Sequence, residues 1–164
     1  MTEASEIPAA LDVAFAEDRT VLIESGVVGR EVEIAVLEGR SGERPRTSSV
    51  IGEIVFNGRD FYDFEAKYLG APGVDLDLPA QITDAEFDAI RDAAVRAFEV
   101  SQCATLARID FFLTESGPVL NEINTLQGFT AISMYPRLWE ESGVEYTDLI
   151  TELIELALEK RPAY

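Results

Sequence analysis

The sequence predicts an α+β fold in which helices flank a largely antiparallel sheet. Runs with the two-residue alternation of strands are interspersed with runs that have the spacing of amphipathic helices. Two strand-like runs, within residues 106–124, lie on either side of a tight turn and follow the longest helical run. Strands joined by a short turn pair in the antiparallel sense. The length of 164 residues suits a single folded unit with helices packed on one sheet.

The N-terminal quarter of the chain predicts one helix and two strands. Residues 5–18 place apolar side chains at helical spacing, and Pro8 fits the first turn of that helix. Residues 20–24 predict a short buried strand, and residues 25–29 predict a turn. Residues 30–39 then alternate, with three β-branched side chains on one face and two glutamates and an alanine on the other.

The middle of the chain predicts a strand, a long loop and a helix. A polar loop at 40–49 leads into a strand at 50–56. Residues 57–80 mix aromatic, charged, Gly and Pro residues without a clear period, so we expect a long loop. Long loops in compact domains are usually functional. Residues 83–103 predict a helix that begins with a Thr-x-x-Glu capping box.

The last residues predict a second long amphipathic helix, which starts at Thr147 or Asp148. We expect this helix and the helix at 83–103 to cover the apolar face of the sheet. The side chains expected in the core are Phe98, Ile109, Phe111, Leu113, Ile123, Leu153 and Leu156.

The hairpin within residues 106–124 carries an unusual set of polar side chains. A three-residue turn at 115–117, with its Gly in the left-handed conformation, makes opposed residue numbers sum to 232. Asp110 then faces Glu122, and Arg108 faces Asn124. The even-numbered positions share one face: Arg108, Asp110, Phe112, Leu120, Glu122 and Asn124. The odd-numbered positions are apolar with one exception, so one face is core and the other is polar.

Two carboxylates that face each other across a strand pair repel. A divalent cation between Asp110 and Glu122 would turn that repulsion into attraction, and the Asn124 carbonyl could complete the site. The chain has no His and one Cys, so any metal should be a hard, oxygen-bound ion such as magnesium or manganese. Arg108 beside them could hold a phosphate or an oxyanion. The alternative is an ordinary, solvated cluster of charges.

Three further segments have both a functional and an ordinary interpretation. Lys67 lies among aromatic residues in the predicted loop, where it is either a phosphate ligand or a surface lysine. Glu24 ends the first predicted strand, either near a ligand or simply in solvent. The stretch 128–130 with Ser133 either presents backbone N–H groups to an anion or is only a turn.

Composition excludes several classes of partner. The formal net charge of -18 makes duplex nucleic acid and anionic membrane surfaces poor partners. No apolar run reaches the roughly 18 residues of a membrane-spanning helix, and the first residues lack the features of a signal peptide. A single cysteine permits no internal disulfide. We therefore expect a soluble, cytoplasmic protein.

Several motifs taken together resemble one family, D-alanine–D-alanine ligase, an ATP-grasp enzyme of peptidoglycan synthesis. They are "VLIE…GREVEIAVLEG", "FYDFEAKYL", "ARIDFFLT", "NEINT…GFTAISMYPRLWE" and "SGVEYTDLITELIELA". The resemblance runs from about residue 6 to about residue 159 and covers only the C-terminal part of the family. It implies that residues 1–24 are a remnant of the central ATP-grasp lobe and that residues 25–164 form the C-terminal catalytic lobe.

The resemblance also implies roles for individual residues. Asp110, Glu122 and Asn124 match the ligands of two magnesium or manganese ions that bridge the ATP phosphates. The other residues implied in ATP binding are Glu24, Ser25, Val27, Glu31, Phe61, Lys67 and Phe112. Lys67 matches the lysine that reaches the terminal phosphate, and Glu31 the acid that holds the ribose.

The substrate side of the site is implied in the same way. Arg108 and the Gly128 backbone match the groups that stabilise the oxyanion, and Ser133 and Met134 the pair that binds the carboxylate of the second D-alanine. Tyr68 falls in the loop that closes over the site. The implied reaction is ligation of two D-alanines through an acyl phosphate, with ATP as co-substrate, in a homodimer.

Two departures from the family pattern leave alternatives open. Gln127 stands where the family usually has Pro before the glycine of the "GFT" turn. About half of the family's length, which includes one ATP lobe, has no counterpart in this sequence. The chain could therefore be a non-catalytic, Mg–ATP-binding fragment, a ligase that joins D-alanine to D-lactate or D-serine, or an acidic scaffold that binds cations without a nucleotide.

Overall fold

A computed structural model describes residues 3–56, 74–130 and 132–159. Its centre is one sheet with the strand order β4-β3-β1-β5-β6, and β2 pairs with β1. The strands are β1 Arg30–Leu37, β2 Arg46–Thr47, β3 Gly52–Phe56, β4 Val74–Asp77, β5 Leu106–Thr114 and β6 Gly117–Asn124. Every pairing between these strands is antiparallel, which confirms the predicted fold class.

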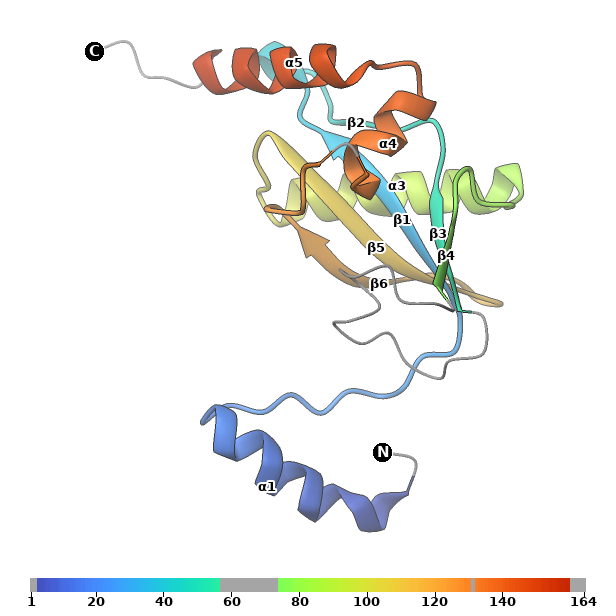
Figure 1. Ribbon diagram of the computed structural model, residues 1–164, viewed down its shortest axis with the longest axis vertical. Helices are drawn as coiled ribbons and strands as arrows, with labels where there is room; N and C mark the ends of the chain where they lie inside the picture. Colours follow the sequence, from blue (N-terminus) through green and yellow to red (C-terminus); the bar gives the residue numbers. More distant parts are fainter. Residues whose placement is uncertain (1–2, 57–73, 131, 160–164) are drawn as a thin grey trace.

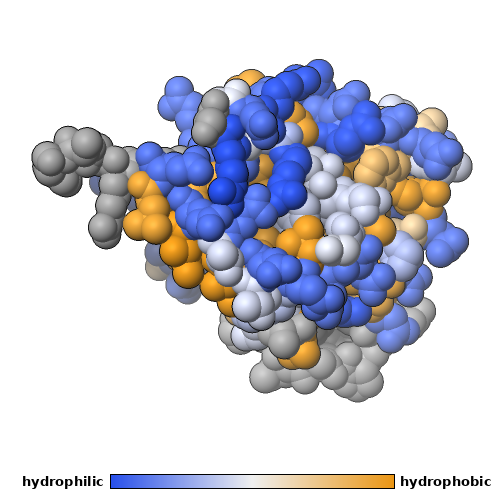
Figure 2. All heavy atoms as spheres, turned by 90° about the horizontal axis from the view of Figure 1, so that it is seen from above, coloured by the Kyte–Doolittle hydropathy of each residue, from blue (hydrophilic) through white to orange (hydrophobic). Residues whose placement is uncertain are grey.

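Helices lie on both faces of the sheet (Figure 1). The described helices are α1 Ile7–Glu17, α3 Asp84–Val100, α4 Met134–Glu141 and α5 Tyr146–Glu159, with short 3-10 turns at Ala4–Glu6 and Arg40–Gly42. None of the described helices is long and apolar enough to cross a membrane. Hydrophilic side chains cover much of the surface seen from the α5 end, with apolar ones between them (Figure 2).

The first core cluster fills the space between α3 and one face of the sheet. Ile90, Ala94 and Phe98 of α3 pack against the apolar side chains of the central strands. The sheet contributes Val32, Ile34, Val36, Ile109, Phe111 and Leu113. This face confirms the predicted core of the hairpin, since only Ile123 of its expected members is partly rather than fully buried.

The second core cluster lies on the opposite face of the sheet, under α4 and α5. Its buried members are Ala35, Leu37, Met134, Tyr135, Leu138, Trp139, Leu149 and Leu156. The expectation that both long helices cover the same face was therefore wrong. The face that carries the polar residues of the hairpin is apolar at its other end, where Ala35 and Leu37 of β1 meet these helices.

Residues 20–24 do not form the predicted strand, and residues 25–29 do not form the predicted turn. They belong to an extended segment between α1 and β1, in which Leu22 is 82% exposed. A strand requires a neighbour that supplies backbone hydrogen bonds, and β1 already has β3 and β5 on its two sides. Helix α1 forms as predicted but buries no side chain, and Figure 1 shows it apart from the sheet.

Two elements form where the sequence predicted irregular structure. β4 lies within the predicted long loop and pairs with β3, so that Leu76 faces Ile54. α4 follows Ser133 in the stretch that ends with "SMYP". Pro136 is compatible with this helix because it lies in the first turn, where the backbone N–H has no intrahelical partner.

The β5–β6 hairpin contains an irregularity that changes its register. The turn has two residues, not the predicted three, because Thr114 pairs with Gly117, whose φ is +112°. A bulge between Asp110 and Phe111 skips Asn121 and restores the predicted pairing of Asp110 with Glu122. Near the turn, the predicted faces of the β6 side chains are therefore exchanged. The predicted register holds only from the bulge to the open end of the hairpin.

The predicted capping box is present at the start of α3. The Glu86 backbone N–H donates to the Thr83 hydroxyl, and the Thr83 backbone N–H donates to the Glu86 carboxylate at 2.7 Å. Hydrogen bonds from the Thr83 backbone and hydroxyl lower the pKa of Glu86. We expect Thr83→Ala to lower the free energy of unfolding by about 1 kcal/mol, measured by urea denaturation. Thr151→Ala, on the outer face of α5, is the control and should cost less.

Candidate functional site

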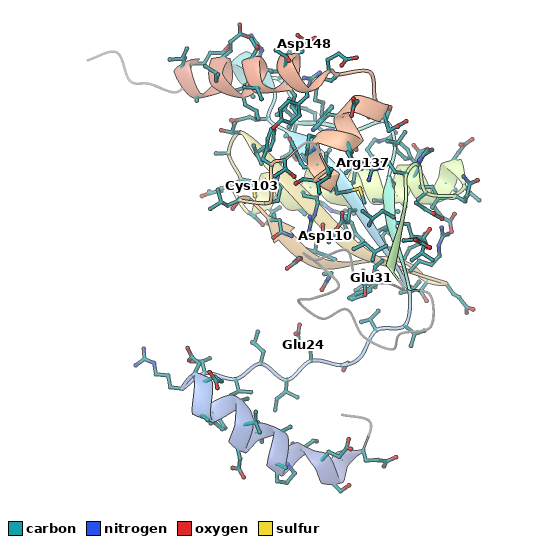
Figure 3. All side chains as sticks on the ribbon, viewed as in Figure 1. Glu24, Glu31, Cys103, Asp110, Arg137 and Asp148 are labelled. Carbon is teal, nitrogen blue, oxygen red and sulfur yellow. The ribbon has the colours of Figure 1, made fainter. Side chains whose placement is uncertain are left out.

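The polar side chains of three neighbouring strands meet on one face of the sheet. Glu33 of β1 lies opposite Asp110 of β5, and Asp110 lies opposite Glu122 of β6. Two residues away on the same face of β5, Arg108 pairs with Ala35 of β1 on one side and with Asn124 of β6 on the other. This face is the one that α4 and α5 cover at its other end. Figure 3 shows Asp110 on the sheet, near its uncovered part.

Arg108 is the centre of this cluster. Its Nε donates to Asp110 Oδ1 at 2.8 Å, and its Nη2 donates to Asp110 Oδ2 at 2.7 Å. The same Nη2 lies 3.3 Å from Glu33 Oε1 and 4.0 Å from Glu122 Oε1. The Arg108 side chain is only 13% exposed. Within the described part of the chain, the Arg108 guanidinium thus contacts three carboxylates, two of them buried, and its fork-like pairing with Asp110 fixes its orientation.

Asn124 joins the two opposed carboxylates. Its amide nitrogen lies 2.9 Å from Glu122 Oε1 and 3.2 Å from Asp110 Oδ2. A carboxylate oxygen accepts and cannot donate when it is ionised, so the amide nitrogen must face both oxygens in this arrangement. Rotation of the amide by half a turn would instead present its oxygen to a cation between the same two carboxylates.

Burial and the neighbouring charges shift the pKa values of Asp110 and Arg108. Burial raises the pKa of Asp110, as does the adjacent Glu122 carboxylate, while Arg108 acts in the opposite direction. Burial alone would lower the pKa of Arg108, but its hydrogen bonds to Asp110 and the charges of Glu33 and Glu122 raise it above its ordinary value. The Arg108 guanidinium therefore stays charged in the folded state.

The donor set fits a hard divalent cation. Among the described residues, no group of three or more His, Cys, Asp or Glu side chains is placed to hold a metal. Two carboxylates from Asp110 and Glu122 together with the Asn124 carbonyl nevertheless provide oxygen ligands of the kind that magnesium and manganese accept. Arg108 occupies one lone-pair position on each Asp110 oxygen, which leaves Oδ1 with a position for a metal.

The predicted anion-binding turn lies at the start of α4. The Thr130 backbone N–H donates to the Ser133 hydroxyl at 3.0 Å, and the Thr130 hydroxyl lies 2.9 Å from the same oxygen. The Met134 side chain is buried in the second core cluster, so only its backbone N–H is suited to contact a ligand. Both amide atoms of the Gln127 side chain are buried and lack a hydrogen-bond partner within the described part of the chain.

The structure brings some of the other predicted residues to the cluster and leaves others apart. Glu31 and Phe112 are cross-strand neighbours on the same face as Asp110. The segment that contains Glu24, Ser25 and Val27 is exposed, and Figure 3 shows Glu24 well separated from Asp110. The remaining three predicted site residues lie outside the described residues: Phe61, Lys67 and Tyr68.

Glu33 belongs to the cluster although the sequence did not identify it as a site residue. It is 4% exposed, in the middle of β1, and forms an ion pair with Arg108. The signal was present in the sequence, because a glutamate inside an apolar strand must find a cation or a hydrogen-bond donor when it is buried. The missing information was the identity of the strand that lies beside β1.

Comparisons with known proteins agree on one family. Residues 1–155 match the family model described as D-ala D-ala ligase C-terminus. The D-alanine–D-alanine ligase of Mycolicibacterium vanbaalenii is 48% identical over 157 residues, which cover 93% of this chain and 42% of that protein. D-alanine–D-alanine ligase A of Chromobacterium violaceum is 50% identical over 157 residues, which cover 95% and 42%.

Solved structures give the same result. The D-alanine–D-alanine ligase from Coxiella burnetii matches with a TM-score of 0.79 and 33% identity, over 98% of this chain and 40% of that one. The VanG D-Ala:D-Ser ligase from Enterococcus faecalis matches with a TM-score of 0.78 and 30% identity, over 94% and 43%. The chain spans less than half the length of these relatives. It therefore belongs to the D-alanine–D-alanine ligase family, of which it represents the C-terminal part.

Proposed function

We propose that this chain supplies the C-terminal lobe of an ATP-dependent ligase that joins two D-alanines for peptidoglycan synthesis. The observation that supports this most directly is the Arg108–Asp110–Glu122–Asn124 cluster on the sheet of a member of this family. In the reaction, the carboxylate of the first D-alanine attacks the γ-phosphate of ATP and gives an acyl phosphate and ADP. The amine of the second D-alanine then attacks the acyl carbonyl, and phosphate leaves.

The carboxylates of the cluster would hold the metal, and its arginine would stabilise the oxyanion. Asp110, Glu122 and the Asn124 oxygen would bind two magnesium or manganese ions, which neutralise the charge of the ATP phosphates. Nε and Nη2 of Arg108 donate to Asp110, and its Nη1 makes no hydrogen bond to any described residue. That free edge can donate to the oxyanion that develops when the second D-alanine attacks. Lys67 would hold the terminal phosphate.

The remaining proposed roles surround this centre. Phe112 beside Glu31 offers an aromatic surface and a ribose-binding acid on one edge of the cluster. The other proposed ATP-binding residues are Glu24, Ser25, Val27 and Phe61. At the start of α4, Ser133 and the backbone N–H groups of Gly128 and Met134 would bind the oxyanion and the carboxylate of the second substrate. Tyr68 would close over the site.

We assign residues 1–24 to a central ATP-grasp lobe and residues 25–164 to the C-terminal lobe. The absence of buried side chains on α1 and its separation from the sheet support this division. Nucleotide binding between two lobes is consistent with the position of α4 and α5, which cover only the far end of the face that carries Asp110. We further propose that the protein acts as a homodimer in the cytoplasm, where ATP is available.

Magnesium-dependent binding of ATP to the 164-residue chain tests the proposal. We expect Glu122→Gln to weaken this binding at least about tenfold, because one charged metal ligand is lost. Glu115→Gln, at the exposed tip of the same hairpin, is the matched control and should bind like the unmodified chain. ATP binding that is independent of magnesium, or equal in both variants, would contradict the assigned metal site.

D-alanine-dependent release of ADP then separates the ligase from the non-catalytic alternative. Release that requires both D-alanine and Glu122 shows that this part of the family carries out the reaction by itself. Binding without ADP release favours a nucleotide-binding part that needs a second lobe.

A D-serine-accepting ligase is the second candidate, because the VanG D-Ala:D-Ser ligase is a close structural match. Product analysis with D-serine as the competing second substrate decides between the two specificities.

A further inference from the structure

Glu33 is a buried acid to which the proposed reaction gives no role. The residue is 4% exposed and lies in the middle of β1, directly opposite Asp110 of β5. Burial of an ionised carboxylate is costly unless a cation or hydrogen-bond donors compensate it. Apolar residues often replace a buried ion pair without loss of stability. The presence of a charge at this position, beside the proposed site, therefore suggests a function for Glu33.

The Glu33 carboxylate contacts the Arg108 guanidinium together with Asp110. Nη2 of Arg108 lies 3.3 Å from Glu33 Oε1 and 2.7 Å from Asp110 Oδ2. Nε of the same guanidinium donates to Asp110 Oδ1 at 2.8 Å. Because the two carboxylates belong to neighbouring strands, they fix the guanidinium from two directions. This arrangement leaves Nη1, the nitrogen proposed to meet the oxyanion, on a different edge of the guanidinium.

A divalent cation at Asp110 and Glu122 would share these carboxylates with Arg108. Nη2 of Arg108 lies 4.0 Å from Glu122 Oε1, in addition to its contacts with Asp110. Two positive charges close to the same carboxylates repel each other, and the repulsion is strong where solvent screening is weak. The Arg108 side chain is largely buried. Binding of the cation therefore weakens the attraction of Asp110 and Glu122 for the guanidinium.

Glu33 contacts Arg108 from a strand that carries none of the proposed metal ligands. In the strand order β1-β5-β6, Asp110 lies between Glu33 and Glu122. Burial acts to lower the pKa of Arg108, whereas its hydrogen bonds to Asp110 and the charge of Glu33 raise it. Glu33 thus stabilises the charged guanidinium by an interaction that a cation between Asp110 and Glu122 does not replace.

We infer that Glu33 is a positioning residue, which retains the Arg108 guanidinium when a divalent cation binds to Asp110 and Glu122. The cation and the guanidinium can then occupy one buried site together. The inference rests on the proposed function, because it requires the metal site at Asp110 and Glu122. Since Glu33 favours the state in which both positive charges are present, its charge must also raise the affinity of the chain for the cation.

Titration with magnesium in the absence of nucleotide tests this inference. An ionic strength of about 0.15 M screens charges beyond roughly 8 Å and leaves buried contact pairs largely intact. We expect Glu33→Gln to bind magnesium at least about fivefold more weakly, which is the lower end of typical coupling between two sites. Glu33→Asp keeps the charge and should recover part of this affinity. Glu115→Gln, at the exposed tip of the hairpin, should bind like the unmodified chain.

Two outcomes of this titration would overturn the inference. Equal affinity of the unmodified chain and of Glu33→Gln would show that Glu33 does not support the cation. An aspartate variant that binds no better than the glutamine variant would assign the loss to packing and not to charge.

The Nε–H signal of Arg108 in nuclear magnetic resonance spectra reports the position of the guanidinium directly. In the unmodified chain we expect slow hydrogen exchange of this group both without magnesium and at saturation. In Glu33→Gln the exchange should stay slow without magnesium, because Asp110 still accepts the hydrogen bond, and become fast at saturation. Slow exchange in the saturated variant would overturn the inference.

The same measurements distinguish failure of the inference from failure of the proposed function. An unmodified chain that binds no magnesium would refute the proposed metal site and the role of Glu33 with it. Magnesium binding that requires Glu122 but not Glu33 would support the metal site and refute the role of Glu33 alone.

Discussion

Arg108→Met should lower the free energy of unfolding by about 3–5 kcal/mol, which makes it one of the most damaging substitutions in the chain. The guanidinium is the shared cation of Glu33, Asp110 and Glu122, and it is 13% exposed. Removing it leaves carboxylates that are buried and mutually repulsive, at a cost greater than the interaction that is lost. Chemical denaturation at pH 7 in the absence of divalent cations measures this effect.

The pH dependence of this variant provides the control. Without Arg108, which lowers the pKa of Asp110, burial and the adjacent Glu122 carboxylate should raise the pKa of Asp110 in the folded state further above its ordinary value. The folded state then binds more protons than the unfolded state, so the stability of the variant should increase as the pH falls from 7 toward about 4. Adding Glu33→Gln should recover part of the lost stability at pH 7. A variant as stable as the unmodified chain would disprove the central role of Arg108.

Ile109→Ala should lower the free energy of unfolding by about 2–5 kcal/mol. Ile109 is 0% exposed, and it lies on a central strand between Ile34 of β1 and Ile123 of β6, against the α3 side of the core. Deleting its side chain leaves a cavity that the surrounding strands cannot close. The midpoint of urea denaturation, with an unchanged slope, measures the loss.

Ile123→Ala is the matched comparison for Ile109→Ala, because the two side chains are cross-strand partners of the same type. Ile123 is only partly buried and lies on the edge strand β6. Its truncation should therefore cost clearly less, since water can fill part of the space. Equal losses at the two positions would show that the core extends further under β6 than its burial indicates.

The hairpin and α3 could be predicted because their patterns are local. The Thr83–Glu86 box and the apolar face of α3 depend on residues three and four apart. The pairing of Asp110 with Glu122 follows from the alternation of side chains along two strands joined by a short turn. The exchange of faces near the turn could not be read from this alternation, because a bulge is a feature of pairing and not of composition.

Longer-range information was needed for the rest. Residues 20–24 have the composition of a buried strand, but both sides of β1 are occupied and no other described strand pairs with them. Glu33 became identifiable as part of the cluster only when β5 was placed beside β1. The position of α5 depends on α4, which buries Tyr135 and Leu138 against the second face of the sheet. Such relations depend on packing between distant segments.

The bulge at Asp110 divides the hairpin into two parts that protein engineering can treat separately. From the bulge to the open end of the hairpin, the numbers of paired residues sum to 232, as for Asp110 and Glu122. From the bulge to the tip, they sum to 231. A foreign peptide can therefore be grafted onto the tip without shifting the pairing of the polar residues, as long as Asn121, the unpaired residue of the bulge, is retained. Deleting Asn121 instead would join the two parts into one uninterrupted ladder and remove the offset that separates them. The hairpin tip is consequently a suitable insertion point for epitopes or affinity handles.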